Sequence, residues 1–144
     1  MKKFLAMLLL TCFIVILIIT VNFNTYQKQQ RQIQSFNKQY EEYNRENLSG
    51  VDVTTLINKA ISNNEKNNIA KDENNLYIEN EENSIKIYIT MMINGKTYPM
   101  ESINKVGMQT FTKSFGEIKF KCTGITYHEK TSQIATMTFE TMQY

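Results

Sequence analysis

The side chains that most often carry out chemistry in proteins are few in this chain, and they lie far apart. Its 144 residues contain two cysteines, Cys12 and Cys122, and one histidine, His128. A zinc site needs several such ligands at short spacings, and two cysteines do not make a disulfide framework. Because Cys12 lies in an apolar run and Cys122 in an expected strand, we interpret both as buried apolar residues. The sequence indicates no metal site.

Acid–base and nucleophilic chemistry has little support either. His128 is expected at the end of a strand, before a turn, where exposure to solvent is the ordinary explanation. Glutamates cluster within residues 41–46 and 79–82, but neither cluster has the glycine-containing spacing of a calcium loop. We interpret the first as a solvated helix face and the second as a turn. No glycine-rich phosphate loop is present, so we predict a protein that is not an enzyme and binds no cofactor.

The charge distribution argues against a nucleic-acid partner. Residues 22–144 contain 14 basic and 14 acidic residues, so the net charge of +2 comes entirely from Lys2 and Lys3. Nucleic-acid-binding domains usually carry clustered lysine and arginine. We therefore expect no nucleic-acid partner, and we connect the two lysines with the way the chain meets a membrane.

The strongest pattern in the sequence is an apolar run over residues 4–21, with 16 apolar residues of 18 and no charge. As a helix it would span about 27 Å at ~1.5 Å per residue, close to the ~30 Å hydrocarbon core of a bilayer. The run is longer than a signal-peptide core, and no small-residue cleavage motif follows it. The residues before Cys12 are a poor lipoprotein signal. We predict an uncleaved anchor over residues 1–22, in contact with the lipid bilayer. The expected lipid-facing residues are Phe4, Leu5, Leu8, Leu9, Phe13, Ile14, Ile16, Leu17, Ile18 and Ile19.

The orientation of this anchor follows from its flanks. Lys2 and Lys3 precede the run, whereas Lys28 and Arg31 follow it, so the positive-inside bias is slight. A short basic start before an apolar run usually leaves the N-terminus in the cytoplasm. We therefore predict a single pass of the cell membrane with the C-terminal part outside the cytoplasm.

A polar, helix-compatible segment over residues 23–48 is predicted to continue the anchor, because no proline or glycine occurs before Gly50. It carries one apolar stripe at helical spacing. The stripe residues are Tyr26, Ile33, Phe36, Tyr40 and Tyr43. The stripe fits either a coiled coil between copies or a helix packed on its own domain. Aromatic residues and only about three heptads favour the second reading, and homo-oligomerisation stays open.

Residues 49–144 are predicted to form a small α+β domain. A helix is expected near residues 52–61, capped by Ser49 or Asp52. It follows a helix end at residues 47–50, where Gly50 takes a left-handed conformation or a simple turn. Six asparagines within residues 63–75 indicate an exposed loop.

Beyond this loop the apolar pattern alternates, which indicates strands. The expected strands are 76–79, 84–92, 96–98, 117–127 and 133–141, with a further strand at 109–113 and a helical turn or loop at 102–107. Asn94–Gly95 predicts a hairpin, and the phase change at Gly124 predicts a β-bulge. We expect a mostly antiparallel sheet of four to six strands with one face covered by the helices.

This order of elements resembles that of type IV pilins and pseudopilins: a short basic start, an apolar helix, an amphipathic continuation and an antiparallel sheet. The likeness is architectural, since the prepilin-peptidase motif is absent and Phe4 follows Lys3 where a pilin has glycine. Residues 36–43 and 50–64 also look similar to small membrane-anchored proteins of clostridia-like bacteria. The resemblance implies a structural or assembly subunit with protein partners in a membrane or surface apparatus. The alternative is a monomeric binding module tethered at the surface.

Overall fold

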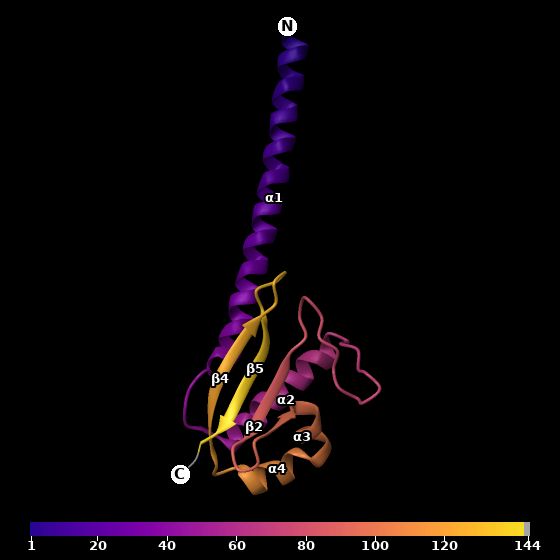
Figure 1. The fold of residues 1–144 in the computed structure, drawn as a ribbon. Helices are drawn as coiled ribbons and strands as arrows, with labels where there is room; N and C mark the ends of the chain where they lie inside the picture. The colour runs from indigo at the N-terminus through magenta and orange to yellow at the C-terminus, as the bar shows by residue number, and fades with distance from the viewer. Residues whose placement is uncertain (143–144) are drawn as a thin grey trace. The chain divides into compact units, whose positions relative to one another are not determined.

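The computed structural model describes residues 1–142, which form two compact units. The first unit is residues 1–35, and the second, which we call the head, begins at Phe36. One helix of 40 residues, α1 (Lys2–Glu41), makes up most of the first unit and supplies the first residues of the head (Figure 1). The prediction of a single long N-terminal helix is therefore confirmed.

Helix α1 ends at Glu41, several residues earlier than the sequence indicated. Its last turn tightens through a hydrogen bond from Tyr43 N to Tyr40 O at 2.9 Å. Asn47 then takes the left-handed backbone conformation, with φ of 60°. Asparagine tolerates this region better than most residues do, and so the turn falls at Asn47 rather than at Gly50.

The second helix, α2 (Gly50–Lys66), starts with the cap that the sequence indicated. Asp52 N donates to Ser49 Oγ at 3.2 Å, and Ser49 N donates to Asp52 Oδ2 at 2.8 Å, which makes a capping box. Gly50 lies against the backbone of Phe115, where a Cβ atom would be 2.0 Å from the carbonyl oxygen. Close packing, not a left-handed φ, explains this glycine.

In the described part of the head, five strands form one mixed sheet in the order β1-β4-β5-β2-β3 (Figure 1). The strands are β1 (Leu48–Ser49), β2 (Lys86–Met91), β3 (Lys96–Pro99), β4 (Lys119–Tyr127) and β5 (Ile134–Thr141). The central pair, β2 and β5, is parallel, and the other neighbours are antiparallel. The predicted α+β class with a mostly antiparallel sheet is confirmed.

Two local features of the sheet match their sequence signals. Strands β2 and β3 form a hairpin around Asn94–Gly95, and Gly95 has a φ of 65°. The register of β4 against β5 shifts between Cys122 and Gly124, as expected for a bulge. Pro99 lies on the edge strand β3, where a missing N–H breaks no ladder.

The sheet has one covered face and one open face. Ile87 and Ile89 of β2 stand opposite Met137 and Phe139 of β5, and all four side chains are fully buried. Helix α2 lies behind the sheet in Figure 1 and contacts β2 and β4. The other face is open at Tyr88 and Thr90 of β2, which are half-buried, whereas Lys86 at the start of the strand is buried.

Two short helices, α3 (Met100–Val106) and α4 (Met108–Phe115), occupy the segment between β3 and β4. They are separated by Gly107, whose φ is 103°. The strand predicted at 109–113 is wrong, although alternating threonines favour a strand locally. In a helix, Phe111 and Phe115 fall on one side, and their ring centroids lie 5.0 Å apart. Packing of these rings overrides the local propensity.

Two further segments differ from expectation. Residues 76–79 form no strand; Tyr77 makes only an isolated bridge with Lys71. The expected loop over residues 63–75 begins inside α2, and Asn64 is completely buried. The amide of Asn64 bonds to the backbone of Ile85, directly before β2, so a local composition typical of loops is misleading at this position.

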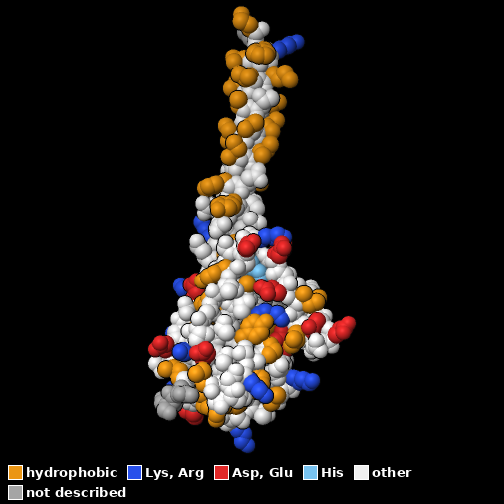
Figure 2. Space-filling view, in the orientation of Figure 1, with side chains coloured by type: hydrophobic (Ala, Val, Ile, Leu, Met, Phe, Trp, Pro, Cys, Tyr) orange, Lys and Arg blue, Asp and Glu red, His pale blue; other side chains and the backbone are white. Residues whose placement is uncertain are grey.

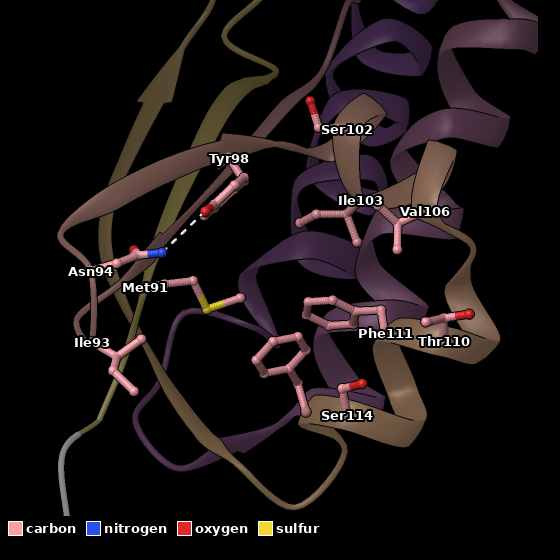
Figure 3. Close-up of a pocket in the computed structure, with 11 residues that line it drawn as sticks. Met91, Ile93, Asn94, Tyr98, Ser102, Ile103, Val106, Thr110, Phe111 and Ser114 are labelled. Atoms are coloured by element: carbon pink, nitrogen blue, oxygen red, sulfur yellow. Dashed lines mark hydrogen bonds between the residues drawn. The ribbon is translucent and has the colours of Figure 1, made fainter.

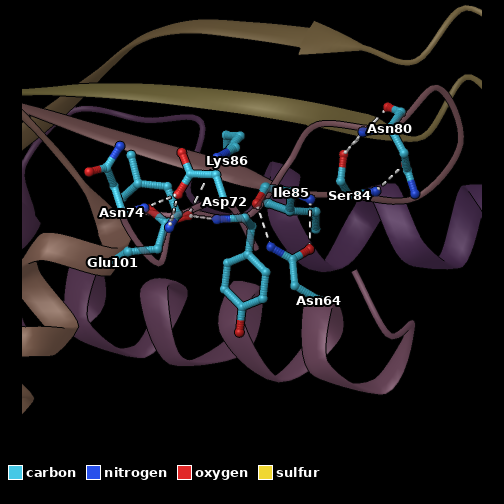
Figure 4. A network of polar contacts seen from close by, with 10 residues as sticks. Asn64, Asp72, Asn74, Asn80, Ser84, Ile85, Lys86 and Glu101 are labelled. Atoms are coloured by element: carbon cyan, nitrogen blue, oxygen red, sulfur yellow. Dashed lines mark hydrogen bonds and ion pairs between the residues drawn. The ribbon is translucent and has the colours of Figure 1, made fainter. Parts of the chain in front are cut away.

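Asparagines join two helices to the starts of the central strands. Asn64 Nδ2 donates to Ile85 O at 2.8 Å, while Asn64 Oδ1 accepts from Ile85 N at 2.8 Å (Figure 4). Asn37 of α1 repeats the arrangement at β5: Nδ2 donates to Ser132 O at 2.8 Å, and Oδ1 accepts from Ile134 N at 3.0 Å. Both amides act as short substitutes for a neighbouring strand.

Candidate functional site

The apolar part of α1 is exposed along the first unit. All ten predicted lipid-facing residues, from Phe4 to Ile19, are exposed. Within the described residues, no part of the apolar stretch of α1 is buried. Figure 2 shows apolar side chains along the visible face of this helix. Its length and composition are sufficient to cross a membrane. The chain thus has one long N-terminal helix that is compatible with a single-pass anchor.

The few polar side chains of the apolar run bond to their own helix. Thr11 Oγ1 donates to Leu8 O at 2.8 Å, and Thr20 Oγ1 donates to Ile16 O at 2.7 Å. A hydroxyl in hydrocarbon needs a partner, because no water is available there. Both threonines are therefore compatible with lipid surroundings.

The apolar stripe of the amphipathic segment is divided between the two units. Phe36, Tyr40 and Tyr43 belong to the core of the head, and Tyr40 is 2% exposed. Tyr43 lies beyond the end of α1, in the tightened turn. In the first unit, Tyr26 is exposed and Ile33 is half-buried. The part of the stripe from Phe36 onward packs on its own domain.

Lys59 of α2 connects α2 with the end of α1. Its Nζ atom donates to Gln39 O at 2.9 Å and lies 5.5 Å from the ring centroids of both Tyr40 and Tyr43. Burial raises the pKa of the Tyr40 hydroxyl far above its ordinary value. This cluster is structural, since within the head it joins the last turn of α1 to α2.

An apolar groove of about 480 Å³ lies between the β2–β3 hairpin and the helices α3 and α4 (Figure 3). The hairpin supplies Met91 and Ile93, α3 supplies Ile103 and Val106, and α4 supplies Phe111. Ile93 is 93% exposed, so the hairpin leaves a large apolar side chain uncovered. A groove of this size and composition is suited to binding apolar groups.

The groove has no acid–base machinery in its walls. Its polar lining consists of hydroxyls and one amide, and Asn94 Nδ2 donates to the Tyr98 hydroxyl at 3.1 Å. No carboxylate, imidazole, thiol or amine is among the described residues that line it. The arrangement can hold a ligand or a protein segment, but it offers no group for proton transfer near neutral pH.

Lysines stand at the margins of the groove. Lys96 lies two residues before Tyr98 on β3, and Lys105 lies three residues after Ser102 on α3, so each shares a face with a lining residue. Both lysines are exposed, and neither is in a salt bridge within the described residues. The groove is therefore apolar with a basic margin.

The opposite end of the sheet carries a polar depression of about 660 Å³, lined in part by Glu79, Glu81, Tyr127 and His128. The expectation of a solvent-exposed histidine is wrong: His128 is 5% exposed. Its Nε2 lies 2.7 Å from Ser84 O, and because a carbonyl only accepts, Nε2 carries the proton and donates. His128 thus holds the loop before β2 against the β4–β5 turn.

A second buried polar contact joins Lys86 of β2 to Glu101 of α3, close to Tyr77. Lys86 Nζ is 3.5 Å from Glu101 Oε1, and the two side chains are only 10% and 8% exposed (Figure 4). Tyr77 N also donates to Glu101 Oε1, at 3.0 Å. Glu101 Oε2 has no hydrogen-bond partner among the described residues. Sequence patterning missed this pair, because its members are 15 residues apart on different elements.

The two cysteines and the histidine do not come together in the part of the chain that the structure describes. The expectation that both cysteines are buried is wrong: Cys12 is exposed on the apolar helix and Cys122 is half-buried in β4, and both thiols are free. Burial raises the pKa of the Cys122 thiol, which disfavours the reactive thiolate. Across residues 1–142, no group of three metal-ligating side chains comes together.

Comparisons of the chain with protein-family models, curated proteins and solved structures found no match.

Proposed function

We propose that this chain is a single-pass membrane protein whose head lies outside the cytoplasm and serves as a structural or assembly subunit. The observation that carries this proposal is the apolar helix of the first unit, exposed on every side and long enough to span a bilayer. The apolar groove supports a role in holding another protein, because exposed apolar surface commonly marks an interaction site.

Insertion of the anchor can be tested by adding charge. Apolar residues contribute roughly −0.3 to −0.6 kcal/mol each and an arginine at the centre about +2.5 to +3.5 kcal/mol. Sixteen apolar residues then contribute about −6 kcal/mol. Leu10→Arg alone should leave the full-length chain partly in alkali-washed membranes, and Leu10→Arg with Ile14→Arg should release it. Phe4→Arg is the matched control, since an arginine near a helix end reaches the interface.

Orientation needs a separate measurement. Alkaline phosphatase fused behind the head should be active, because this enzyme works only outside the cytoplasm, and a cytoplasmic reporter at the same position should be inactive. The reverse pattern would place the head inside the cell and end the proposed topology.

Assembly is tested by chemical crosslinking of the full-length chain in native membranes. A structural subunit should give defined species larger than the monomer. Monomers alone at every crosslinker concentration would instead favour the alternative, a surface-tethered binding module that works as a single copy. The solvent-open groove is the observation that favours this alternative.

A further inference from the structure

The two ends of the head differ in charge and shape. One end carries the apolar groove with Lys96 and Lys105 at its margins; we call it the basic end. The other end carries residues 78–82, which we call the acidic loop. Strand β2 begins beside this loop and ends at Met91 in the groove, so the two ends are separated by about 20 Å.

The acidic loop combines an exposed apolar residue with glutamates. Ile78 is 50% exposed, and Glu79, Glu81 and Glu82 follow it on the surface. Glu81 pairs with Lys130, whereas Glu79 and Glu82 have no salt bridge in the described residues. Figure 2 shows acidic side chains at the upper end of the head in that view, with basic side chains beside them. The acidic loop thus presents one exposed apolar side chain, Ile78, next to two glutamates that form no salt bridge in the described residues.

Hydrogen bonds hold the backbone of residues 80–84 in one conformation. Asn80 Oδ1 accepts hydrogen bonds from the backbone N–H groups of Glu82, Asn83 and Ser84, at 3.1, 2.9 and 2.9 Å. Thr131 Oγ1 in the β4–β5 turn also donates to the carbonyl oxygen of Glu82. A loop fixed in this way loses little conformational entropy when it binds.

We propose that the groove at the basic end of one copy binds the acidic loop of a second copy. Ile78 enters the groove, and Glu79 and Glu82 face Lys96 and Lys105. Charge complementarity selects this occupant: the groove margin has unpaired lysines, and the acidic loop has unpaired glutamates next to an exposed isoleucine. The inference rests on the proposed assembly function and names its partner as the chain itself.

Such a contact joins different surfaces of the two copies. Because the groove and the acidic loop lie at opposite ends of β2, the acidic loop of one copy cannot bind in the groove of the same copy. Each added copy leaves one groove and one loop unoccupied. A heterologous contact of this kind produces rows, or rings where the rotation closes.

Disulfide trapping in membranes tests the contact directly. Full-length chains lacking native thiols (Cys12→Ala, Cys122→Ala) would be co-expressed with different tags, one carrying Ile78→Cys and the other Val106→Cys. Mild oxidation should give a mixed-tag dimer. The matched control replaces Ile78→Cys by Val51→Cys, since Val51 is 51% exposed and lies on α2. Protease resistance of each head reports whether the variant is folded.

Charge exchange supplies a second test. Lys96→Glu with Lys105→Glu should lower the dimer yield roughly ten-fold, as should Glu79→Lys with Glu82→Lys in the partner chain. Combining both reversed chains should restore most of the yield. Restoration supports the proposed pairing, because damage to folding in either chain would not be repaired by the other.

Three results would overturn the inference. Equal trapping by Val51→Cys and Ile78→Cys would indicate random collision in the membrane. A disulfide of the Val106→Cys chain with a different protein, and none with Ile78→Cys, would assign the groove to another partner. Absence of any trapped dimer, while chemical crosslinking still yields larger species, would refute this contact and leave the assembly function standing.

Discussion

Asn64 satisfies both backbone polar groups of Ile85 with one side-chain amide, inside the core of the head. Removing the amide leaves a buried N–H and a buried C=O without partners, at about 1–3 kcal/mol for each. We expect Asn64→Ala to lower the free energy of unfolding by about 2–6 kcal/mol. Denaturant unfolding of the full chain in detergent, followed by tyrosine circular dichroism, measures this. Asn58→Ala, an exposed change on the same helix, should cost under ~0.5 kcal/mol.

The Lys86–Glu101 pair predicts a non-additive response. Lys86→Met alone leaves a buried carboxylate unpaired and should destabilise the head by about 3–5 kcal/mol. The double change Lys86→Met with Glu101→Leu should recover most of this loss, because neither charge then remains buried. A double-mutant cycle from urea unfolding gives the coupling. Simple addition of the two single effects would mean that the pair is not coupled.

The capping box of α2 predicts a contribution to the free energy of unfolding that depends on pH. The hydrogen bond from Ser49 N is the main reason that the pKa of Asp52 lies below its ordinary value of 3.8. A lowered folded-state pKa stabilises the fold above the ordinary value, and the stabilisation is lost as the pH falls through the lowered pKa. Asp52→Asn should therefore cost at most about 1 kcal/mol at pH 7, since the carboxylate is partly exposed, and progressively less below about pH 4. Urea unfolding of the parent chain and of Asp52→Asn at several pH values measures this trend, with Glu73→Gln, an exposed change, as the matched control.

The close approach of Gly50 to Phe115 predicts sensitivity to a single methyl group. Gly50→Ala must move backbone, because its Cβ would lie 2.0 Å from a carbonyl oxygen. Such overpacking should cost about 1–3 kcal/mol. At Gly124 the same substitution meets only Thr138 Oγ1 at 3.4 Å, so Gly124→Ala should cost less. Thermal unfolding of the two variants compares them, and equal losses would contradict the packing explanation.

The sequence predicted those parts of the fold that depend on short periods. The alternation from Ile85 to Met91 identified β2, and Gly124 marked the bulge in β4. Periodicity gave the wrong secondary structure where a tertiary contact determines it. The segment around Phe111 alternates like a strand but is helical, because its ring packs in the core. Asn64 and His128 read as surface residues, since composition does not reveal which polar side chains meet buried backbone.

The candidate site was less accessible to prediction than the fold. The groove needs α4 as one wall, and the sequence indicated a strand there. Its other walls come from the hairpin and from α3, and α3 is joined to α4 through Gly107, whose positive φ has no periodic sequence signal. The long apolar helix was easier to predict, because an unbroken apolar run is itself the signal.

Strand β5 is made last among the strands, yet it lies between β4 and β2 in the sheet. During synthesis the apolar helix leaves the ribosome long before this strand exists. The head therefore cannot close its sheet cotranslationally until residues 134–141 have emerged, and until then β2 and β4 have no common neighbour. A premature stop before Ile134 would remove the middle of the sheet rather than trim an edge, and would leave the apolar helix joined to a head that cannot fold.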